Sequence, residues 1–370
     1  MTRLPGLDLL RAIAVVWVML FHSFLVGGLG QDFKWLERYG WMGVDIFFVL
    51  SGFLIGRQVL APLARGERLS FGDFYARRAW RILPAFVVVL AIYVAFPQWR
   101  EAEGLAPWWM FATFTFNLLI DYGTQQAFSH AWSLCVEEHF YLVFPALAVF
   151  MAKRPSVAKF VGLCAFVVVG GVAVRAGTWL HYDAVQPDRP WFVEDLYYPT
   201  WCRLDGLLAG VVLAVIVVFR PATWERMTRR GNAFLAVGVA GMALAFWLFE
   251  QRTGLIGNAV GWPVLSWSIA CLVVAGASSQ SWIGRRAMPG AGWIAAISYS
   301  LYLSHKLVFA AVDRTWGEAL AGHGLPTFAV YAVATLAGGA ALHYAVERPF
   351  LRLRERRRDA ARPRLAEAGA

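Results

Sequence analysis

The sequence predicts an all-α integral membrane protein with about ten transmembrane helices. The chain of 370 residues is 59% hydrophobic and only 16% charged, which is too apolar for a water-soluble protein of this length. Apolar runs long enough to cross a bilayer as helices recur along the whole chain. Aromatic residues, including 18 Trp, make up 15% of the chain, as expected for belts at the two membrane interfaces.

Each long apolar run is expected to form one transmembrane helix. A shorter run at 107–120 would rise only ~21 Å as a helix, which is too short for a ~30 Å hydrocarbon core. The ten longer runs lie approximately at 7–27, 41–60, 82–97, 133–151, 159–180, 200–219, 232–249, 259–278, 292–313 and 326–347.

The basic residues predict how these spans are oriented. Cytoplasmic loops carry the excess of Lys and Arg, and all basic clusters fall on one side only if 107–120 does not cross. We therefore expect a re-entrant or interfacial segment at 107–120, both termini in the cytoplasm, and a location in the cytoplasmic membrane. The basic clusters lie at 57–81, 153–159, 226–230, 285–286 and 348–364.

Residues 1–350 are expected to form the membrane domain, and residues 351–370 a basic, disordered cytoplasmic tail. The net charge of +10 fits basic loops and this tail, so we expect no nucleic-acid partner. The four Cys lie in or beside apolar runs and form no CxxC pair. Neither a disulfide framework nor a metal site is therefore expected.

Polar residues form a stripe along the first predicted span. Arg11 and His22 are 11 residues apart, which places them on one helix face ~16 Å apart along the axis. Asp8 precedes Arg11 by three residues and shares that face. Such a stripe is expected to face a cavity rather than lipid. Alternatively, Asp8 and Arg11 are interfacial anchors and His22 is a packing residue.

Carboxylates occur near the outer ends of the second and fourth predicted spans. Asp45 is a functional candidate because an acid within a span is costly, whereas Ser51 and the Gly after it fit close packing of a helix or a ligand. Glu137 and Glu138 point about 100° apart, so only one of them faces a given pocket squarely. A carboxylate at this depth would orient a histidine on a neighbouring helix. Stabilisation of the helix N-terminus is the alternative for the two glutamates.

Arg78 and Arg81 lie one helical turn apart in the basic segment before the third span. Two guanidiniums with this spacing suit bidentate binding of phosphates. Membrane topology and lipid headgroups explain the charge without such a role. Further supporting candidates occur in the sixth and ninth spans, namely Arg203, Asp205, Tyr302 and His305.

Seven motifs occur in an order that resembles the acyltransferase-3 family of membrane O-acyltransferases, which includes enzymes that O-acetylate surface polysaccharides. The resemblance covers roughly residues 4–350. The motifs are an Arg followed by ten residues and a His, then GVDIFFVLSGFLI, RRAWRILP, HAWSLCVEEHFYLVFP, RLDGLLAG, ISYSLYLSHK and ERPF. The resemblance implies an acyl-CoA donor, usually acetyl-CoA, taken from the cytoplasm, and an acceptor hydroxyl on a glycan or small molecule.

The resemblance also implies roles for residues at matching positions. His22 matches the catalytic histidine, Arg11 its paired residue, and Glu137 the motif glutamate, while Arg78 and Arg81 match a pair implicated in acyl-CoA use. The sequence departs from the family pattern at three places, where Cys135 replaces a common Ser, His139 replaces a common Gln, and Lys306 follows His305 in place of an aromatic residue and Pro.

The residues and the resemblance together predict a membrane O-acyltransferase that acts on a cell-surface carbohydrate. In this hypothesis His22 is the general base, and Asp45 or Glu137 orients it; transient acylation of His22 is the alternative mechanism. A multi-pass transporter or exporter of a glycan or a proton-coupled solute is the alternative function, because such proteins also carry ionisable residues in their spans. A non-catalytic scaffold would not require the polar stripe.

Overall fold

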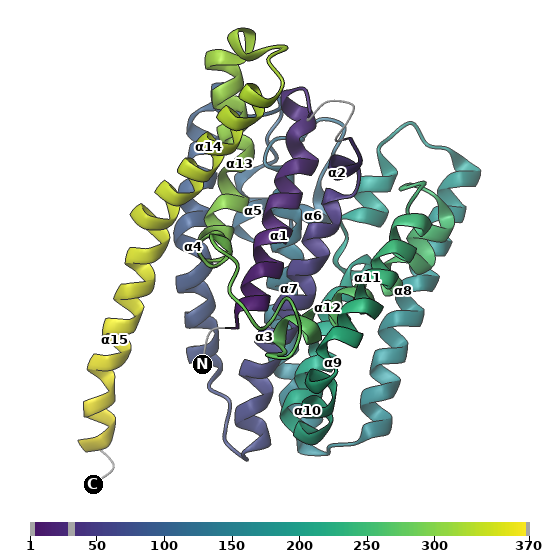
Figure 1. Cartoon of the computed structure of the whole chain (residues 1–370), viewed down its shortest axis with the longest axis vertical. Helices are drawn as coiled ribbons and strands as arrows, with labels where there is room; N and C mark the ends of the chain where they lie inside the picture. Colours follow the sequence, from purple (N-terminus) through teal and green to yellow (C-terminus); the bar gives the residue numbers. More distant parts are fainter. Residues whose placement is uncertain (1–3, 29–33, 368–370) are drawn as a thin grey trace.

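The computed structural model describes residues 4–28 and 34–367, and its regular elements in these ranges are helices (Figure 1). Nine helical stretches of the described chain are long and apolar enough to cross a membrane, or ten if a bent pair counts as one span. The predicted all-α membrane fold is thereby confirmed. The main helices of these stretches and of the bent pair are α1 (Pro5–His22), α3 (Gly43–Ala64), α4 (Phe71–Ala95), α7 (Trp132–Lys153), α8 (Val157–Val185), α9 (Leu204–Phe219), α11 (Gly231–Leu248), α12 (Trp262–Ala277), α13 (Ala291–Leu320) and α14 (Leu325–Leu342).

Helix α4 begins well before the predicted third span. Its N-cap is Ser70, whose hydroxyl accepts a hydrogen bond from the backbone N–H of Asp73, a typical way to start a helix. The basic segment with Arg78 and Arg81 is therefore part of the same helix as the apolar span.

The sixth span is the bent pair. Helix α9 ends at Phe219, and α10 (Pro221–Arg229) follows at an angle of 113°. Pro221 stands at the first turn of α10, where its missing N–H costs nothing but a continuous helix cannot form.

The segment 107–120, which we expected to be re-entrant or interfacial, forms two short helices, and neither is long enough to cross a membrane. These are α5 (Trp108–Ala112) and α6 (Phe116–Leu119), which are separated by Phe114 in the left-handed region at φ 55°. The buried amide of Asn117 donates to the carbonyl of Tyr198 and to the hydroxyl of Thr200. The segment is thus partly buried, with Phe111, Phe116 and Asn117 inside the protein and Trp108, Trp109 and Leu119 exposed.

Helix α1 runs through the middle of the view in Figure 1 and packs against α3, α12 and α13. Helices α3 and α9 approach each other closely at two glycines. A Cβ added to Gly52 would lie 2.1 Å from the carbonyl oxygen of Leu207, and one added to Gly210 would lie 2.1 Å from that of Val49. Small residues permit such close helix contacts, and this packing holds α3 against α9.

The C-terminal helices run along the left edge of Figure 1. Helix α14 continues through a π-helical turn, His343–Glu347, into α15 (Arg348–Glu367). We expected a disordered tail over 351–370, but its described part is helical as far as Glu367, in keeping with a segment rich in the helix formers Arg, Ala, Glu and Leu. Residues 368–370 lie outside the described residues, as do 29–33 of the first predicted outer loop.

Candidate active site

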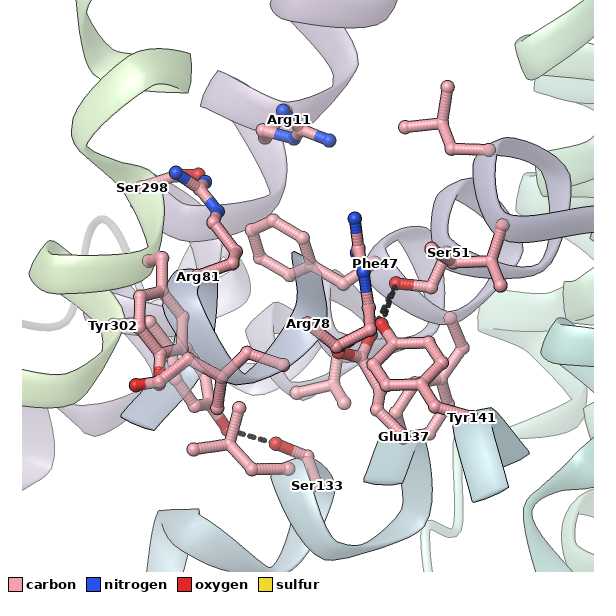
Figure 2. A pocket seen from close by; sticks show the side chains of 17 residues that line it. Arg11, Phe47, Ser51, Arg78, Arg81, Ser133, Glu137, Tyr141, Ser298 and Tyr302 are labelled. Atoms are coloured by element: carbon pink, nitrogen blue, oxygen red, sulfur yellow. Dashed lines mark hydrogen bonds between the residues drawn. The ribbon is translucent and has the colours of Figure 1, made fainter. Parts of the chain in front are cut away.

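A cavity with both apolar and polar lining lies among α1, α3, α4, α7 and α13, and three arginines lie at one end of it. Figure 2 shows the side chains of Arg11, Arg78 and Arg81 pointing into this end, with Ser133 at the other. Arg11 comes from α1, whereas Arg78 and Arg81 project from successive turns of α4. The structure therefore brings together the three arginines that the sequence suggested, in an arrangement that suits an anionic ligand. We call the whole cavity the arginine pocket.

The two arginines of α4 differ in their partners. Arg81 forms an ion pair with Glu347, which is buried and also accepts hydrogen bonds from Ser300 and pairs with His343. Arg78 lies 5.8 Å from the ring centre of Tyr141. Its Nε atom is buried and has no hydrogen-bond partner within the described residues. Arg78 is therefore the better candidate for direct contact with a ligand, because a buried donor without a partner is costly.

Glu137 provides a carboxylate in the same pocket. Its Oε1 accepts a hydrogen bond from the hydroxyl of Ser51 at 2.6 Å, and its Oε2 accepts one from the phenol of Tyr141 at 3.0 Å (Figure 2). The neighbouring Glu138 does not line this cavity. Only one of the two adjacent acids faces the pocket, as the helical geometry predicts. Glu137 belongs to the arginine pocket and makes no hydrogen bond to His22 in the described chain.

Histidines gather at the other end of α1. The Nδ1 atom of His22 lies 3.0 Å from Nε2 of His305 on α13, and the two ring centres are 4.9 Å apart. The ring of His130, just before α7, lies 4.8 Å from that of His305 and 6.3 Å from that of His22. These three residues form what we call the histidine cluster. The sequence placed His22 and His305 among the candidates but not His130.

Tyr302 connects the arginine pocket to the histidine cluster. Its side chain lines the pocket (Figure 2), and its hydroxyl lies 2.6 Å from that of Ser133 and donates to the carbonyl of His130 at 2.9 Å. Its own backbone carbonyl lies 2.7 Å from Nδ1 of His305. One residue of α13 therefore contacts both regions, and its polar groups are satisfied by them.

Asp45 is not beside His22. Its carboxylate instead accepts a hydrogen bond from Arg203 at 2.9 Å, and both side chains are almost fully buried. Aromatic rings of Trp132, Tyr197 and Trp262 surround the guanidinium of Arg203, with ring centres 3.7–4.9 Å from its Cζ atom. Asp45, one of the two acids expected to orient His22, therefore forms a buried ion pair with Arg203.

Asp205 belongs to a second buried ion pair. Its partner is Arg175, at 2.7 Å, and Arg175 also donates to the carbonyls of Cys202, Asn258 and Ala259. This network ties α8 and α9 to the segment before α12. Asp8 lies one turn before Arg11 on α1, at the end of the stripe that carries the arginine pocket.

A buried ammonium lies beside the histidines, and the sequence suggested no role for it. The ammonium of Lys306 donates to the hydroxyl of Ser129 at 3.0 Å and lies 3.6 Å from the carboxylate of Glu101. The position of His130 and Ser129, directly before the fourth span, was the available signal, since the quoted motif HAWSLCVEEHFYLVFP begins there. Glu101 sits in a loop far away in the sequence, and no local pattern identifies it. Among the described residues, no group of three or more His, Cys, Asp or Glu side chains is arranged to hold a metal ion.

The fold and the site place the protein in the class of polytopic membrane proteins. Its helices surround the arginine pocket and the adjacent histidine cluster. Residues 4–344 match the family described as an acyltransferase domain, and the chain belongs to this acyltransferase-3 family. The resemblance seen in the motifs is thereby confirmed. No solved structure matches the chain.

Three similar proteins are named as O-acetyltransferases. The peptidoglycan O-acetyltransferase OatA of Listeria monocytogenes is 29% identical over 66% of this chain and 39% of its own length. The O-acetyltransferase OatA of Staphylococcus aureus is 26% identical over 84% of this chain and 51% of its own length. The putative peptidoglycan O-acetyltransferase YrhL of Bacillus subtilis is 28% identical over 82% of this chain and 48% of its own length. The chain therefore matches about half or less of each of these relatives.

Proposed function

We propose that the protein is a membrane O-acyltransferase that moves an acyl group, in the first place acetyl, from acyl-CoA to a hydroxyl of a carbohydrate outside the cytoplasm. The observation that carries this proposal is that Tyr302 lines the arginine pocket and also contacts His130 and His305, the latter 3.0 Å from His22. Membership of the acyltransferase family and the names of the relatives support it.

The arginine pocket is the proposed site for the anionic part of the donor. Phosphates of acyl-CoA suit guanidiniums, which bind them with two parallel hydrogen bonds. Arg78 would hold such a group directly, and Arg11 and Arg81 would add positive charge. The basic clusters on the same side of the bundle support an orientation with both termini and this pocket toward the cytoplasm, in the cytoplasmic membrane.

The histidine cluster is the proposed site of chemistry. His22 takes the proton of the acceptor hydroxyl, whose oxygen then bonds to the acyl carbonyl carbon. The carbon–sulfur bond of the thioester breaks, and the CoA sulfur leaves as a thiolate that recovers a proton from the imidazolium. Histidine suits this task because its unperturbed proton affinity makes the neutral base available near pH 7.

The names of the relatives suggest the acceptor class. Two relatives are named for peptidoglycan O-acetylation, so we propose a glycan of the cell envelope as acceptor. The histidine cluster lies at the end of α1 opposite the arginine pocket, ~16 Å away along the helix. This separation supports a donor that enters from one side of the membrane and an acceptor that enters from the other.

The test uses the full chain in lipid nanodiscs with radiolabelled acetyl-CoA and soluble peptidoglycan fragments. We expect label on the fragments, and we expect His22→Ala to reduce transfer by ~10²–10⁴-fold. His323→Ala, at an exposed residue after α13, is the matched control and should transfer normally. Normal transfer by a folded His22→Ala variant would overturn the role of His22. In proteoliposomes, counterflow of glycan without acyl transfer would instead support the transporter.

A further inference from the structure

We propose that His305 is a positioning residue that holds His22 in one tautomer, with the proton on Nδ1 and the lone pair of Nε2 directed to the acceptor hydroxyl. The tautomer follows from contacts of the described residues alone, and its consequence for catalysis rests on the proposed function.

The backbone carbonyl of Tyr302 determines where His305 carries its proton. This oxygen lies 2.7 Å from Nδ1 of His305, and a carbonyl oxygen only accepts hydrogen bonds. Nδ1 of His305 must therefore be the donor. The side chain of Tyr302 is itself fixed by two contacts of its hydroxyl, one with the hydroxyl of Ser133 and one with the carbonyl of His130. The carbonyl that selects the tautomer is thus part of a fixed helix turn.

The surroundings of His305 favour its neutral form. Its side chain is 0% exposed, and burial of a charge without a partner is costly. None of the hydrogen bonds and ion pairs recorded for the described chain joins His305 to a carboxylate. The next residue, Lys306, already places one ammonium in this region, and the carboxylate of Glu101 lies beside that ammonium. A second positive charge on His305 would lack compensation.

A neutral imidazole has one N–H, so His305 with its proton on Nδ1 presents a lone pair at Nε2. That atom lies 3.0 Å from Nδ1 of His22. The hydrogen bond forms only if His22 is the donor, which places the proton of His22 on Nδ1. The remaining nitrogen of His22, Nε2, then carries the lone pair that accepts a proton.

This arrangement is similar to a Ser-His-Asp triad, in which the Asp carboxylate fixes the tautomer and orientation of the histidine base. Here a neutral imidazole occupies the place of the carboxylate. When His22 takes the proton of the hydroxyl at Nε2, the imidazolium keeps its Nδ1–H bond to His305. Asp45 and Glu137, the acids that the sequence suggested for this task, are engaged with Arg203 and with Ser51 and Tyr141.

The tautomer is tested directly by nitrogen NMR on the full chain labelled with ¹⁵N-histidine. The His22 signal is assigned by its loss in His22→Gln, and we expect a protonated Nδ1 and an unprotonated Nε2. In His305→Leu the acceptor is gone, and His22 should lose its preference for Nδ1–H. His323→Gln, the matched control, should remove only its own signal. A native His22 with its proton on Nε2, or on both nitrogens, would overturn the proposal whether or not the protein transfers acyl groups.

Kinetics separate positioning from mere packing. His305→Gln keeps an acceptor near the position of Nε2, whereas His305→Leu keeps the volume and loses the acceptor. We expect His305→Leu to lower kcat by about 10²-fold with an unchanged KM for acetyl-CoA, and His305→Gln to restore kcat to within about tenfold of native. A folded His305→Leu variant as active as His305→Gln would contradict the positioning role. Absence of transfer by the native protein would count against the proposed function alone, because the NMR result stands without it.

Discussion

Arg203 and Asp45, 158 residues apart in sequence, form an ion pair with 2.9 Å between Nη2 and Oδ1, and their side chains are only 1% and 3% exposed. The ring centre of Trp262 lies 3.7 Å from the Cζ atom of Arg203, close enough for a cation–π contact. The pair joins the start of α3 to the start of α9. We therefore expect Asp45 to stabilise the contact between α3 and α9.

Asp45→Ala is expected to destabilise the protein strongly, because it leaves the Arg203 guanidinium buried without its partner. Breaking a buried pair in this way typically costs ~3–5 kcal/mol. Asp45→Asn keeps an acceptor and should cost less. Thermal unfolding in detergent measures both effects. Glu67→Ala removes the acid of an exposed pair with Arg65 and should leave Tm unchanged. A native Tm for Asp45→Ala together with lost transfer would return Asp45 to a catalytic role.

Gly52→Ala tests the contact between α3 and α9. The added Cβ would lie 2.1 Å from a backbone oxygen of Leu207, so the helices must separate. Overpacking of this kind typically costs ~1–3 kcal/mol. Gly72→Ala in the first turn of α4 is the matched control, because nothing lies within 4 Å of its added Cβ. Unfolding curves should show a lower Tm for Gly52→Ala and a native or slightly higher Tm for Gly72→Ala. Equal curves would show that α9 adjusts without cost.

The local features of the fold were predictable from the sequence because they depend on composition and length. Apolar runs marked the spans, and the short run at 107–120 was too short to cross. The convergence of Arg78 with Arg81 was also predictable, since a helix places residues three apart on one face. The early start of α4 was not predictable from the apolar run. The helix begins after its N-cap Ser70, in the basic segment where hydropathy is low.

The partners of the site residues depended on tertiary contacts that spacing does not encode. Both Glu137 and Asp45 were expected to be able to orient His22. In the structure Glu137 accepts a hydrogen bond from Ser51, and Asp45 accepts one from Arg203. His305 takes that place although 283 residues separate it from His22. Only the packing of α1 against α13 brings these two imidazoles together. The position of a residue along a span predicts its depth in the membrane. It does not predict which of several polar side chains at that depth the residue contacts.

Arg78→Ala and Arg81→Ala are expected to weaken donor use in different ways. Arg78 has a buried donor without a partner, so its loss should raise the KM for acetyl-CoA by about 10–100-fold, which corresponds to a charged hydrogen bond of ~1.5–3 kcal/mol. Arg81→Ala should also lower Tm, because Glu347, only 1% exposed, loses its guanidinium partner and keeps only Ser300 and His343.

Steady-state transfer at varied acetyl-CoA and thermal unfolding separate these two effects. Arg229→Ala on α10 is the control, since Arg229 is 62% exposed and lies outside the pocket. Both its KM and its Tm should be native. An unchanged KM in folded Arg78→Ala would leave membrane topology as the only role of that arginine.

Tyr302→Phe tests whether the arginine pocket and the histidine cluster are coupled through one side chain. The variant keeps the ring and the backbone carbonyl that contacts His305, but it removes the hydroxyl that links Ser133 to the carbonyl of His130. Ser133 still donates to the carbonyl of His130 at 3.3 Å, so Tm should fall by only the ~0.5–1.5 kcal/mol that one hydrogen bond contributes. The kcat should fall less than in His305→Leu, because the tautomer of His22 is still selected. Since Tyr302 and Ser133 share one hydrogen bond, the losses of Tyr302→Phe and Ser133→Ala should be less than additive in the double variant. Additive losses would mean that the two hydroxyls act independently and that the pocket and the cluster are not coupled through this bond.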